Sequence, residues 1–273
     1  MTEATHYIHG AGEAEAERLA TLNRLLNAAC LREAAPRPGD RILDVGAGQG
    51  QLTRALARAA GRAALGVERD PAQGALARRL AAAEGEAALL ELREGDALAL
   101  PLRQEEWGTF DLAHARFILE HVHSPERVVA QMVRAVRPGG RIILCDDDHA
   151  LLRLHPEPTG LAPVWEAFVE SYRRLGNDPR VGRRLVALRP GAGAAPRRAT
   201  FVHFGACAGD PSFPAFASNL LENLRGARGA ILATGLVDGP ALDAALLAFT
   251  AFAARPDAVI WYAMPWAEGV RPG

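Results

Sequence analysis

The sequence contains no lysine. All 31 basic residues are arginine, and 32 acidic residues balance them to a formal net charge of -1 at pH 7. Without lysine the chain cannot form a lysine Schiff base with a substrate or cofactor. The balanced charge argues against a broad electrostatic surface for nucleic acid, so no nucleic-acid partner is expected and only a local basic patch stays open.

Cysteine is also scarce. Cys30, Cys145 and Cys207 lie far apart and form no CxxC pair, which argues against a zinc site and against a disulfide framework. Long apolar runs are missing, and the first residues, MTEATHYIHGAGEAEAERL, lack both a cationic segment and an apolar segment. We therefore expect a soluble, cytoplasmic protein without a membrane partner.

The first half of the chain alternates between strand and helix patterns. This alternation is typical of a doubly wound α/β fold whose parallel sheet binds ligands at the carboxyl ends of its strands. We expect helices at 13–34, at 49–60, from 71 onward and at 125–136, and strands at 41–45, 64–68, 89–93, 110–115 and 141–148.

The second half is less regular. Its patterns predict helices at 162–175, 179–188 and within 213–255, and strands at 200–206 and 258–264. We expect these elements to complete the same sheet and to add helices over its edge. The expected organisation is a lid and leading helix at 1–35, a binding core at 36–150 and the completion of the same domain at 151–273.

A glycine-rich stretch follows the first strand. In RILDVGAGQG the loop Gly46–Gly50 has the spacing G-x-G-x-G, whereas a pyrophosphate-binding loop prefers G-x-G-x-x-G. Glycine is required where the backbone adopts a positive φ or where a ligand approaches closely, although a merely tight turn is an alternative. The loop carries no Arg or Lys, which favours a cationic or zwitterionic ligand over a pyrophosphate.

Acids follow three consecutive strands, at Asp44, Glu68 and Asp96. Glu68 can accept hydrogen bonds from both hydroxyls of a ribose, and Asp96 can accept one from an exocyclic adenine amine. Ala97 offers a backbone N–H to a ring nitrogen of the base. Together the three acids predict a binding site for a nucleoside that carries no phosphate.

The motifs ILDVGAGQG, GVERD, EGDALALP, FDLAHARFILEHV and RAVRPGGRIIL resemble those of class I S-adenosylmethionine-dependent methyltransferases. Within that family the chain looks most like the small-molecule methyltransferases related to ubiquinone and menaquinone biosynthesis enzymes. The resemblance implies a seven-stranded Rossmann-like fold and S-adenosyl-L-methionine as cofactor. It also implies contacts to the methionine part from Asp44, Gly46, Ala47, Gly48, Gly50 and Arg116, to the ribose from Glu68, and to the adenine from Arg69, Asp96 and Ala97. Solvated charges are the alternative for Arg69 and Arg116.

Two residues are candidates for catalysis. A hydroxyl acceptor benefits from a general base, most often histidine, and in related enzymes the histidine of the LEHV motif, here His121, faces the substrate. An acid is common at the position of Asp146, where it could orient His121 or a substrate hydroxyl. A histidine that only packs or caps locally is the alternative for His121 and the favoured interpretation of His123.

Two further segments carry alternatives. CDDDH at 145–149 resembles a divalent-metal cluster, but acids at a strand end are commonly solvated or capping, and we expect no metal. In related enzymes a segment such as THYIHG folds over the cofactor, which implies lid roles for Tyr7 and His9; a frayed terminus is the alternative.

The favoured function is methyl transfer to an O, N or C atom of a small-molecule acceptor. No D-P-P-Y stretch follows the fourth strand, and no Pro-Cys nucleophile of cytosine chemistry is present. The apolar residues near 213–224 favour a packing face, with a substrate cover or a homodimer contact as the roles left open. The competing functions are a noncatalytic S-adenosylmethionine-binding module and a nicotinamide-dependent oxidoreductase.

Overall fold

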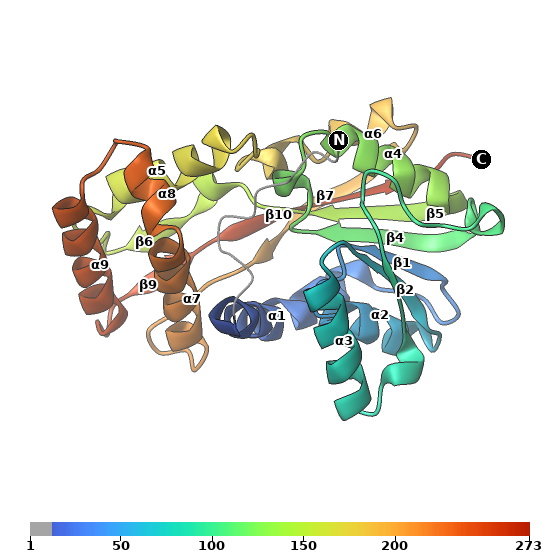
Figure 1. The fold of residues 1–273 in the computed structure, drawn as a ribbon, viewed down its shortest axis with the longest axis horizontal. Helices are drawn as coiled ribbons and strands as arrows, with labels where there is room; N and C mark the ends of the chain where they lie inside the picture. Colours follow the sequence, from blue (N-terminus) through green and yellow to red (C-terminus); the bar gives the residue numbers. More distant parts are fainter. Residues whose placement is uncertain (1–12) are drawn as a thin grey trace. The chain divides into compact units, whose positions relative to one another are not determined.

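The computed structural model describes residues 13–273, apart from the side chains of residues 13–20, 22 and 24. Its largest element is a seven-stranded sheet with the order β3-β2-β1-β4-β5-β10-β7 (Figure 1). The five strands from β3 to β5 are parallel, and β10 runs antiparallel to β5. The expected mainly parallel, doubly wound sheet is confirmed. In spatial order the strands span Leu90–Glu94, Ala64–Glu68, Ile42–Val45, Phe110–Arg116, Val136–Cys145, Ala263–Val270 and Ala195–His203.

Three helices cover the parallel part of this sheet. α2 (Gln51–Ala60) and α3 (Pro71–Ala83) lie on one face, and α4 (Pro125–Ala135) lies on the other (Figure 1). Local start signals explain two of them: proline opens α3 and α4, and the Asp70 carboxylate accepts a 2.8 Å hydrogen bond from the Ala72 N–H. The strands consequently end at one common edge.

Helix α1 spans Glu13–Ala34, the predicted range. The buried Arg141 fixes its carboxyl end, because Nη2 donates to the Ala34 carbonyl at 2.6 Å and Nη1 donates to the Ala35 carbonyl at 3.2 Å. The Arg141 Nε donates to the Glu268 carboxylate at 2.8 Å. One guanidinium therefore satisfies helix carbonyls that lack intrahelical partners and compensates a buried acid.

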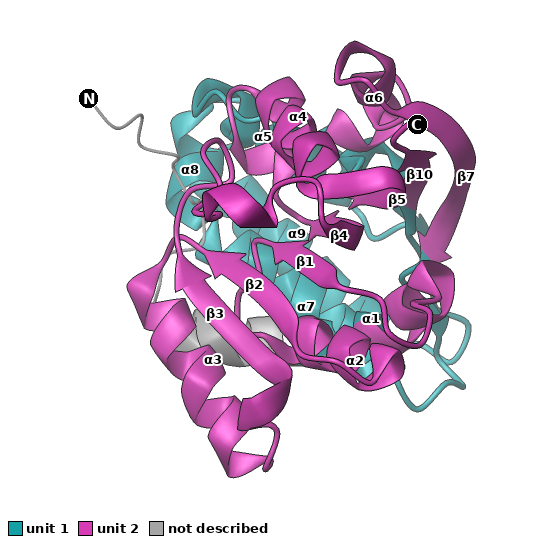
Figure 2. Cartoon of the chain, turned by 90° about the vertical axis from the view of Figure 1, so that its right-hand side faces the viewer, with its two compact units in different colours: residues 1–26, 148–180, 203–264 teal, residues 27–147, 181–202, 265–273 magenta. Residues whose placement is uncertain are grey.

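The chain divides into two compact units, which Figure 2 colours separately. Unit 1 contains residues 1–26, 148–180 and 203–264. Unit 2 contains residues 27–147, 181–202 and 265–273. These boundaries do not follow the expected division into 1–35, 36–150 and 151–273. Unit 2 holds the parallel strands and their core, in which side chains such as Leu43, Ala113 and Met132 are fully buried.

Unit 1 contains helices and a small sheet of its own. The order of the small sheet is β6-β9-β8, and β9 is antiparallel to both neighbours. These strands span Arg153–His155, Val259–Trp261 and Ala206–Cys207. The helices of this unit are α5 (Leu161–Arg174), α7 (Phe213–Gly226), α8 (Arg228–Ala233) and α9 (Gly239–Ala253).

Three elements differ from the sequence-based expectations. The apolar run 258–264 is divided between two sheets: it contributes β9 to the small sheet, and its last two residues begin β10 of the large sheet. The strand expected at 200–206 begins earlier, as β7, and ends at His203. The helix expected at 179–188 is replaced by the short 3-10 helix η5 (Val181–Arg184) and the one-turn α6 (Leu188–Gly191), because Gly182 packs against backbone carbonyls.

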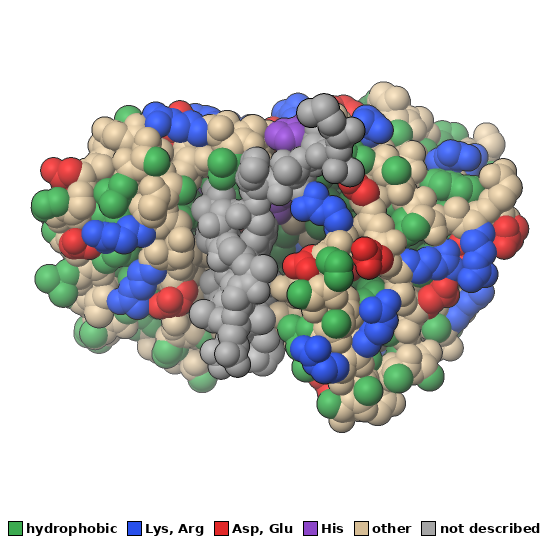
Figure 3. All heavy atoms as spheres, viewed as in Figure 1, with side chains coloured by type: hydrophobic (Ala, Val, Ile, Leu, Met, Phe, Trp, Pro, Cys, Tyr) green, Lys and Arg blue, Asp and Glu red, His purple; other side chains and the backbone are tan. Residues whose placement is uncertain are grey.

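Acidic and basic side chains are interspersed on the face drawn in Figure 3. Ion pairs also form between exposed side chains of the described residues, such as Arg228 with Asp243. Within the described part of the chain, no helix combines the length and the apolar character needed to cross a membrane.

Candidate functional site

The loop after β1 is fixed to the neighbouring strand β2. The N–H groups of Gly46 and Ala47 both donate to the Val67 carbonyl, at 2.8 and 3.0 Å. Gly46, Gly48 and Gly50 adopt φ values of 75°, 53° and 69°, a left-handed region that glycine enters without steric cost. The predicted glycine loop is therefore a single rigid turn at the carboxyl end of β1.

The three glycines have different surroundings. A Cβ on Gly46 would lie 2.0 Å from the Ile118 Cδ1, so the absence of a side chain there is required by packing. A Cβ on Gly50 would lie 3.1 Å from Leu90 and 3.3 Å from Ala77. At Gly48, among the residues that the structure describes, no atom outside the adjacent residues lies within 4 Å of the Cβ position. Gly48 therefore borders open space, and packing does not explain why this residue is glycine.

Glu68, at the end of β2, holds the same loop. Its Oε2 accepts a 2.8 Å hydrogen bond from the Gly48 N–H, and its Oε1 accepts a 2.9 Å hydrogen bond from the Asp70 N–H. The side chain is half-buried. The structure thus brings Glu68 and the glycine loop together, as the motif predicts, and leaves the carboxylate at the border of solvent.

Asp44 points into the sheet unit instead of toward solvent. It is 4% exposed, and its two oxygens accept from the Thr53 hydroxyl at 2.6 Å and contact the His114 Nδ1 at 2.8 Å. His114 is fully buried and packs at a tilt against the Trp266 ring. Asp44 therefore stabilises the strand end that carries the glycine loop. Sequence reasoning did not identify its partner His114.

The signal that could have identified His114 is the strand register. Asp44 and His114 are direct neighbours in the parallel pair β1 and β4. Residues at one level of adjacent strands project to the same face of a sheet. An acid and a histidine at such positions predict a hydrogen bond once the strand order is known.

Asp96 and Ala97 follow β3. The Asp96 Oδ1 accepts a 2.9 Å hydrogen bond from the Leu98 N–H, and the Ala99 N–H donates to the Asp96 carbonyl at 3.0 Å. This local turn fixes the carboxylate just past the strand end. Ala97 is half-buried against the core of unit 2.

The two predicted arginines lie in different environments. Arg69 is exposed beside Glu68. Arg116, at the end of β4, donates from Nη2 to the Asn27 side chain at 3.0 Å and from Nη1 to the Cys30 sulfur at 3.4 Å. These contacts direct Arg116 toward α1. The other two predicted residues of this group, Tyr7 and His9, lie outside the described residues.

His121 ends the short 3-10 helix η3 (Leu119–His121). It is half-buried, and its Nε2 lies 3.3 Å from the Glu120 Oε1. Glu120 is itself buried. Sequence reasoning expected Asp146 as the carboxylate beside this ring and did not consider Glu120. His123, two residues further, is exposed.

Asp146 is fully buried at the start of the segment after β5. Its Oδ2 accepts from the Ile118 and Leu119 N–H groups at 3.0 and 2.7 Å, and its Oδ1 accepts from the Asp147 N–H at 3.0 Å. Burial raises its pKa well above the usual value, and the nearby charges of Glu120 and Asp147 add to this effect. Asp146 therefore holds the turn that leads to His121.

The segment CDDDH is divided by the boundary between the units, which falls between Asp147 and Asp148. In unit 2 the Asp147 carbonyl accepts from the Gly182 N–H at 2.9 Å. A Cβ on Gly182 would lie 2.7 Å from that oxygen, so glycine is needed here, which sequence reasoning missed. The absence of a metal stays a prediction for this segment.

In unit 1 the rest of that segment begins the 3-10 helix η4 (His149–Leu151), and Asp148 caps it by accepting from the Ala150 N–H at 3.1 Å. Aromatic side chains enclose His149. The Trp165 Nε1 donates to the His149 carbonyl at 2.8 Å, and the Tyr262 hydroxyl lies 3.3 Å from the His149 Nδ1. His149 is thus part of the core of unit 1.

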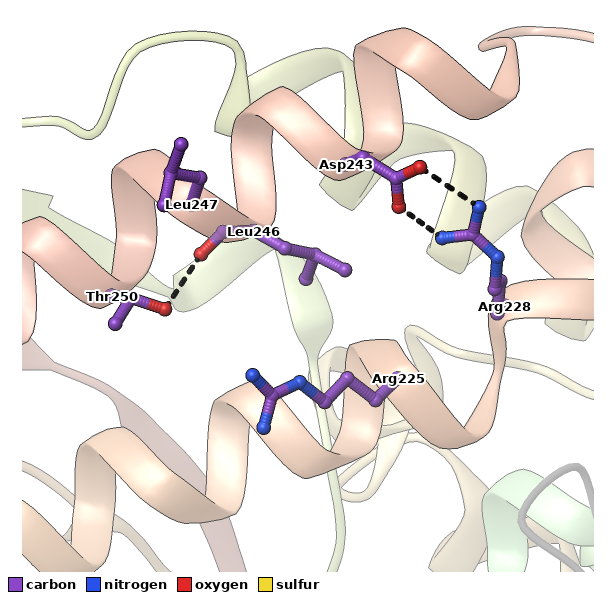
Figure 4. Close-up of a pocket in the computed structure, with 6 residues that line it drawn as sticks. All are labelled: Arg225, Arg228, Asp243, Leu246, Leu247 and Thr250. Atoms are coloured by element: carbon purple, nitrogen blue, oxygen red, sulfur yellow. Dashed lines mark hydrogen bonds and ion pairs between the residues drawn. The ribbon is translucent and has the colours of Figure 1, made fainter.

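A cavity of about 400 Å³ lies among α7, α8 and α9 of unit 1 (Figure 4). Its charged residues already have partners, because Arg228 pairs with Asp243 and Arg225 donates to Glu222 at 2.8 Å. Its remaining residues are Leu246, Leu247 and Thr250. None of the residues predicted from the motifs lines this cavity.

Comparisons with known proteins agree with the motifs. A family model described as a methyltransferase domain matches residues 43–144. A 2-phytyl-1,4-naphtoquinone methyltransferase of Synechococcus elongatus is 32% identical over 46% of this chain and 53% of its own length. A ubiquinone/menaquinone biosynthesis C-methyltransferase of a Ruegeria species is 32% identical over 46% of this chain and 49% of its own length. The chain thus spans about half the length of the curated relatives it matches.

Solved structures share the fold over nearly the whole chain. Geranyl diphosphate C-methyltransferase from Streptomyces coelicolor A3(2) superposes with a TM-score of 0.56 at 14% identity, over 98% of this chain and 88% of that protein. The cyclase SpnF superposes with a TM-score of 0.56 at 19% identity, over 98% and 85%. At such identities the superpositions establish the fold and leave the reaction open, as the pairing of a transferase with a cyclase illustrates.

Proposed function

We propose that the chain is an enzyme that transfers a methyl group from S-adenosylmethionine to a small molecule, and the match of residues 43–144 to a methyltransferase-domain model supports this. The observation that carries this proposal is the pairing of Gly48 with Glu68. A left-handed glycine borders open space, and the carboxylate that accepts its N–H lies at the end of the next strand. This arrangement suits a nucleoside beside a closely approached backbone.

The described residues fit this cofactor. Any Cβ at position 48 would project into the space beside the loop. A ligand that approaches the backbone closely needs this space to stay open, as glycine leaves it. Glu68 would hold the ribose hydroxyls, Asp96 and Ala97 would hold the adenine edge, and no basic residue in the loop would call for a pyrophosphate. When bound, S-adenosylmethionine supplies an electrophilic methyl group on a sulfonium.

Asp44 has a supporting role in this proposal. Asp44 is buried, and its oxygens contact Thr53 and His114, so it stabilises the turn that carries the glycine loop. Arg116 and Arg69 remain candidates for the methionine and adenine sides. Tyr7 remains a candidate lid residue.

His121 is the proposed proton acceptor for a hydroxyl or protonated acceptor. When its Nε2 carries the proton, this atom donates to the Glu120 Oε1, and the accepting nitrogen of the ring is then Nδ1. Asp146 positions His121 by holding the backbone of the preceding turn. We assign Asp146 this positioning role, and methyl transfer to an O, N or C atom remains the reaction class.

The acceptor class is supported by the names of the relatives. One relative is named as a 2-phytyl-1,4-naphtoquinone methyltransferase, and the other as a ubiquinone/menaquinone biosynthesis C-methyltransferase. Quinones are small organic molecules. The described cysteines are free, as is usual in a reducing compartment, and a cytoplasmic location is part of the proposal.

Two measurements test the proposal. Calorimetry should detect binding of S-adenosylmethionine and S-adenosylhomocysteine, and incubation with a library of quinones, phenols and amines should yield S-adenosylhomocysteine together with a methylated product. Binding without turnover across the library would support a noncatalytic binding module. Tight binding of NADH without affinity for S-adenosylhomocysteine would support an oxidoreductase and contradict the proposal.

A further inference from the structure

Phe117, the first residue after β4, has an unusual backbone conformation. Its φ is 56°, in the left-handed region that glycine enters without steric cost and that a bulky side chain rarely adopts. Among the non-glycine residues that the structure describes, only Phe117 and Ala35 have a positive φ. A conformation of this kind persists where the surrounding structure imposes it, and it indicates a functional constraint at that position.

Hydrogen bonds on both sides of Phe117 impose this conformation. Its own N–H donates to the carbonyl of Cys145, the last residue of β5, at 3.1 Å. The next two N–H groups, those of Ile118 and Leu119, donate to the Asp146 Oδ2 at 3.0 and 2.7 Å. Asp146 is fully buried, so release of these N–H groups would leave a buried carboxylate short of hydrogen bonds, which is unfavourable. Asp146 therefore anchors the strained turn.

The same turn connects the glycine loop to His121. The Ile118 Cδ1 lies 2.0 Å from the position that a Cβ of Gly46 would take, so the turn packs directly on the loop. The His121 N–H donates to the Ile118 carbonyl at 3.1 Å. Ile118 thus contacts the loop with its side chain and holds His121 with its backbone. A change in the dihedral angles of Phe117 would move both contacts together, because these angles direct the chain that follows.

We propose that Phe117 is a strained positioning residue, which couples the placement of His121 to the packing of Ile118 on the glycine loop. While Asp146 accepts from the turn, Phe117 stays left-handed, and both the loop and His121 are held in place. When this anchor is weakened, Phe117 relaxes to a common backbone conformation and the two contacts are lost together. The proposal rests on the proposed function, because that function gives the glycine loop its cofactor and His121 its role as proton acceptor.

Two substitutions at Phe117, each made with and without a weakened anchor, test the proposal in the full-length protein. Phe117→Gly and Phe117→Ala both remove the ring, but only the first removes the strain, so the comparison between them isolates the backbone. Asp146→Asn weakens the anchor, because an amide offers one acceptor oxygen and an NH2 group where a carboxylate offers two acceptor oxygens. The four proteins form a double-mutant cycle.

We expect a difference in cofactor affinity that is present only when the anchor is weak. With Asp146 intact, Phe117→Gly and Phe117→Ala should bind S-adenosylhomocysteine equally tightly in calorimetry. Combined with Asp146→Asn, Phe117→Ala should bind it about tenfold more weakly than Phe117→Gly, which corresponds to the free energy of a left-handed alanine. Rescue by Phe117→Gly is not expected of a side chain that only packs, because this substitution removes more atoms than Phe117→Ala does.

The placement of His121 has its own measurement. Its imidazole NMR signal is identified by the loss of that signal in His121→Ala. In the Asp146→Asn background, Phe117→Ala should shift the signal, and Phe117→Gly should return it to the position that it has with Asp146 intact. This measurement needs neither the cofactor nor a methyl acceptor.

Urea unfolding tests the strain itself. Phe117→Gly should have a higher urea midpoint than Phe117→Ala, by roughly a few tenths molar, because glycine relieves the left-handed conformation. Phe201 is the matched control, since it is an exposed aromatic residue within the strand β7. There the order should be reversed, because glycine in an extended strand is less favourable than alanine.

Several results would overturn the proposal. These are the same order of midpoints at Phe117 and Phe201, equal affinities of the two proteins that carry Asp146→Asn, and a His121 signal that does not respond. Absence of S-adenosylhomocysteine binding in the parent protein would instead contradict the proposed function, and the urea midpoints and the His121 signal would still decide on the strained turn. If Phe117→Ala with Asp146→Asn does not fold, Phe117→Gly should restore folding in that background, and two unfolded proteins would count against the proposal.

Discussion

Substitution of Gly48 by alanine separates a ligand-binding role of the glycine loop from a structural one. The residue has φ 53°, and alanine in this left-handed conformation should lower the folding stability by roughly 1–2 kcal/mol. Within the described part of the chain, no atom outside the adjacent residues lies within 4 Å of the new methyl group, so packing there adds no further cost. Gly48→Ala should therefore fold, with a melting temperature lowered by only a few degrees.

The effect on cofactor binding should be much larger. If S-adenosylmethionine occupies the space at Gly48, the methyl group overpacks the complex, at a cost of about 1–3 kcal/mol. This cost corresponds to a dissociation constant raised by about 5- to 150-fold. Isothermal titration calorimetry with S-adenosylhomocysteine measures the change directly.

Gly61 supplies the matched control. It has φ 66° at the carboxyl end of α2, and none of the described residues beyond its chain neighbours lies within 4 Å of its Cβ position. Gly61→Ala should therefore lose a similar amount of stability and keep the affinity of the parent protein. Equal affinities in the two variants, at similar melting temperatures, would show that no ligand occupies the space at Gly48 and would refute the assignment of the loop.

Three further predictions concern single side chains. Glu68→Gln leaves only one side-chain oxygen for the two backbone N–H donors and removes the charge that would bind a ribose. Calorimetry should therefore find a cofactor affinity about tenfold lower. An unchanged affinity would contradict the ribose role. His121→Ala should lower kcat by about 10²- to 10⁴-fold with little change in cofactor affinity. His123 is exposed, and His123→Ala should leave both kcat and cofactor affinity unchanged. Equal turnover in the two variants would remove His121 from the mechanism. The hydrogen bonds of Arg93 hold the pKa of the buried Glu106 carboxyl at about 2, below its ordinary 4.5. Between these values the unfolded chain binds more protons than the folded one, so the free energy of unfolding should fall as the pH drops from about 4.5 to 2, by up to about 3 kcal/mol. Urea titrations of Glu106→Gln should show a smaller decrease over this range, and an identical pH profile would exclude the pair as its source.

The elements of the cofactor half were predictable because their signals are local. The strand before the glycines, the Asp70 cap and the Pro125 start each lie within a few residues of the element that they define. The glycine loop and Glu68 follow from the same logic, since parallel strands end at one edge of a sheet.

The last strand of the large sheet was not predictable in this way. β10 contains Pro265, which lacks an N–H, and Glu268, a buried acid that argues against a strand within a sheet. Each residue has a long-range partner: the Pro265 carbonyl accepts from the Asp146 N–H at 3.2 Å, and Arg141 pairs with Glu268. Neither partner is visible in the local pattern.

The partners of the candidate site also depend on tertiary structure. Asp146 was expected to orient His121 or a substrate hydroxyl; its oxygens accept from backbone amides, and Glu120 is the carboxylate beside the His121 ring. The hydrogen bond from Arg116 to the Cys30 sulfur joins the end of β4 to a helix 86 positions away in the sequence. Spacing alone does not reveal such pairs.

The long excursion of the chain between Phe204 and Tyr262 begins and ends at one point. The Phe204 N–H donates to the Tyr262 carbonyl at 2.7 Å, so the two ends of the excursion are already joined like the base of a hairpin. A segment whose ends meet can be shortened, lengthened or exchanged while the flanking chain keeps its course. Replacing the segment between these two residues with a tight turn would remove α7, α8 and α9 and keep α5, so it would test whether the parallel sheet folds and binds its ligand without those three helices.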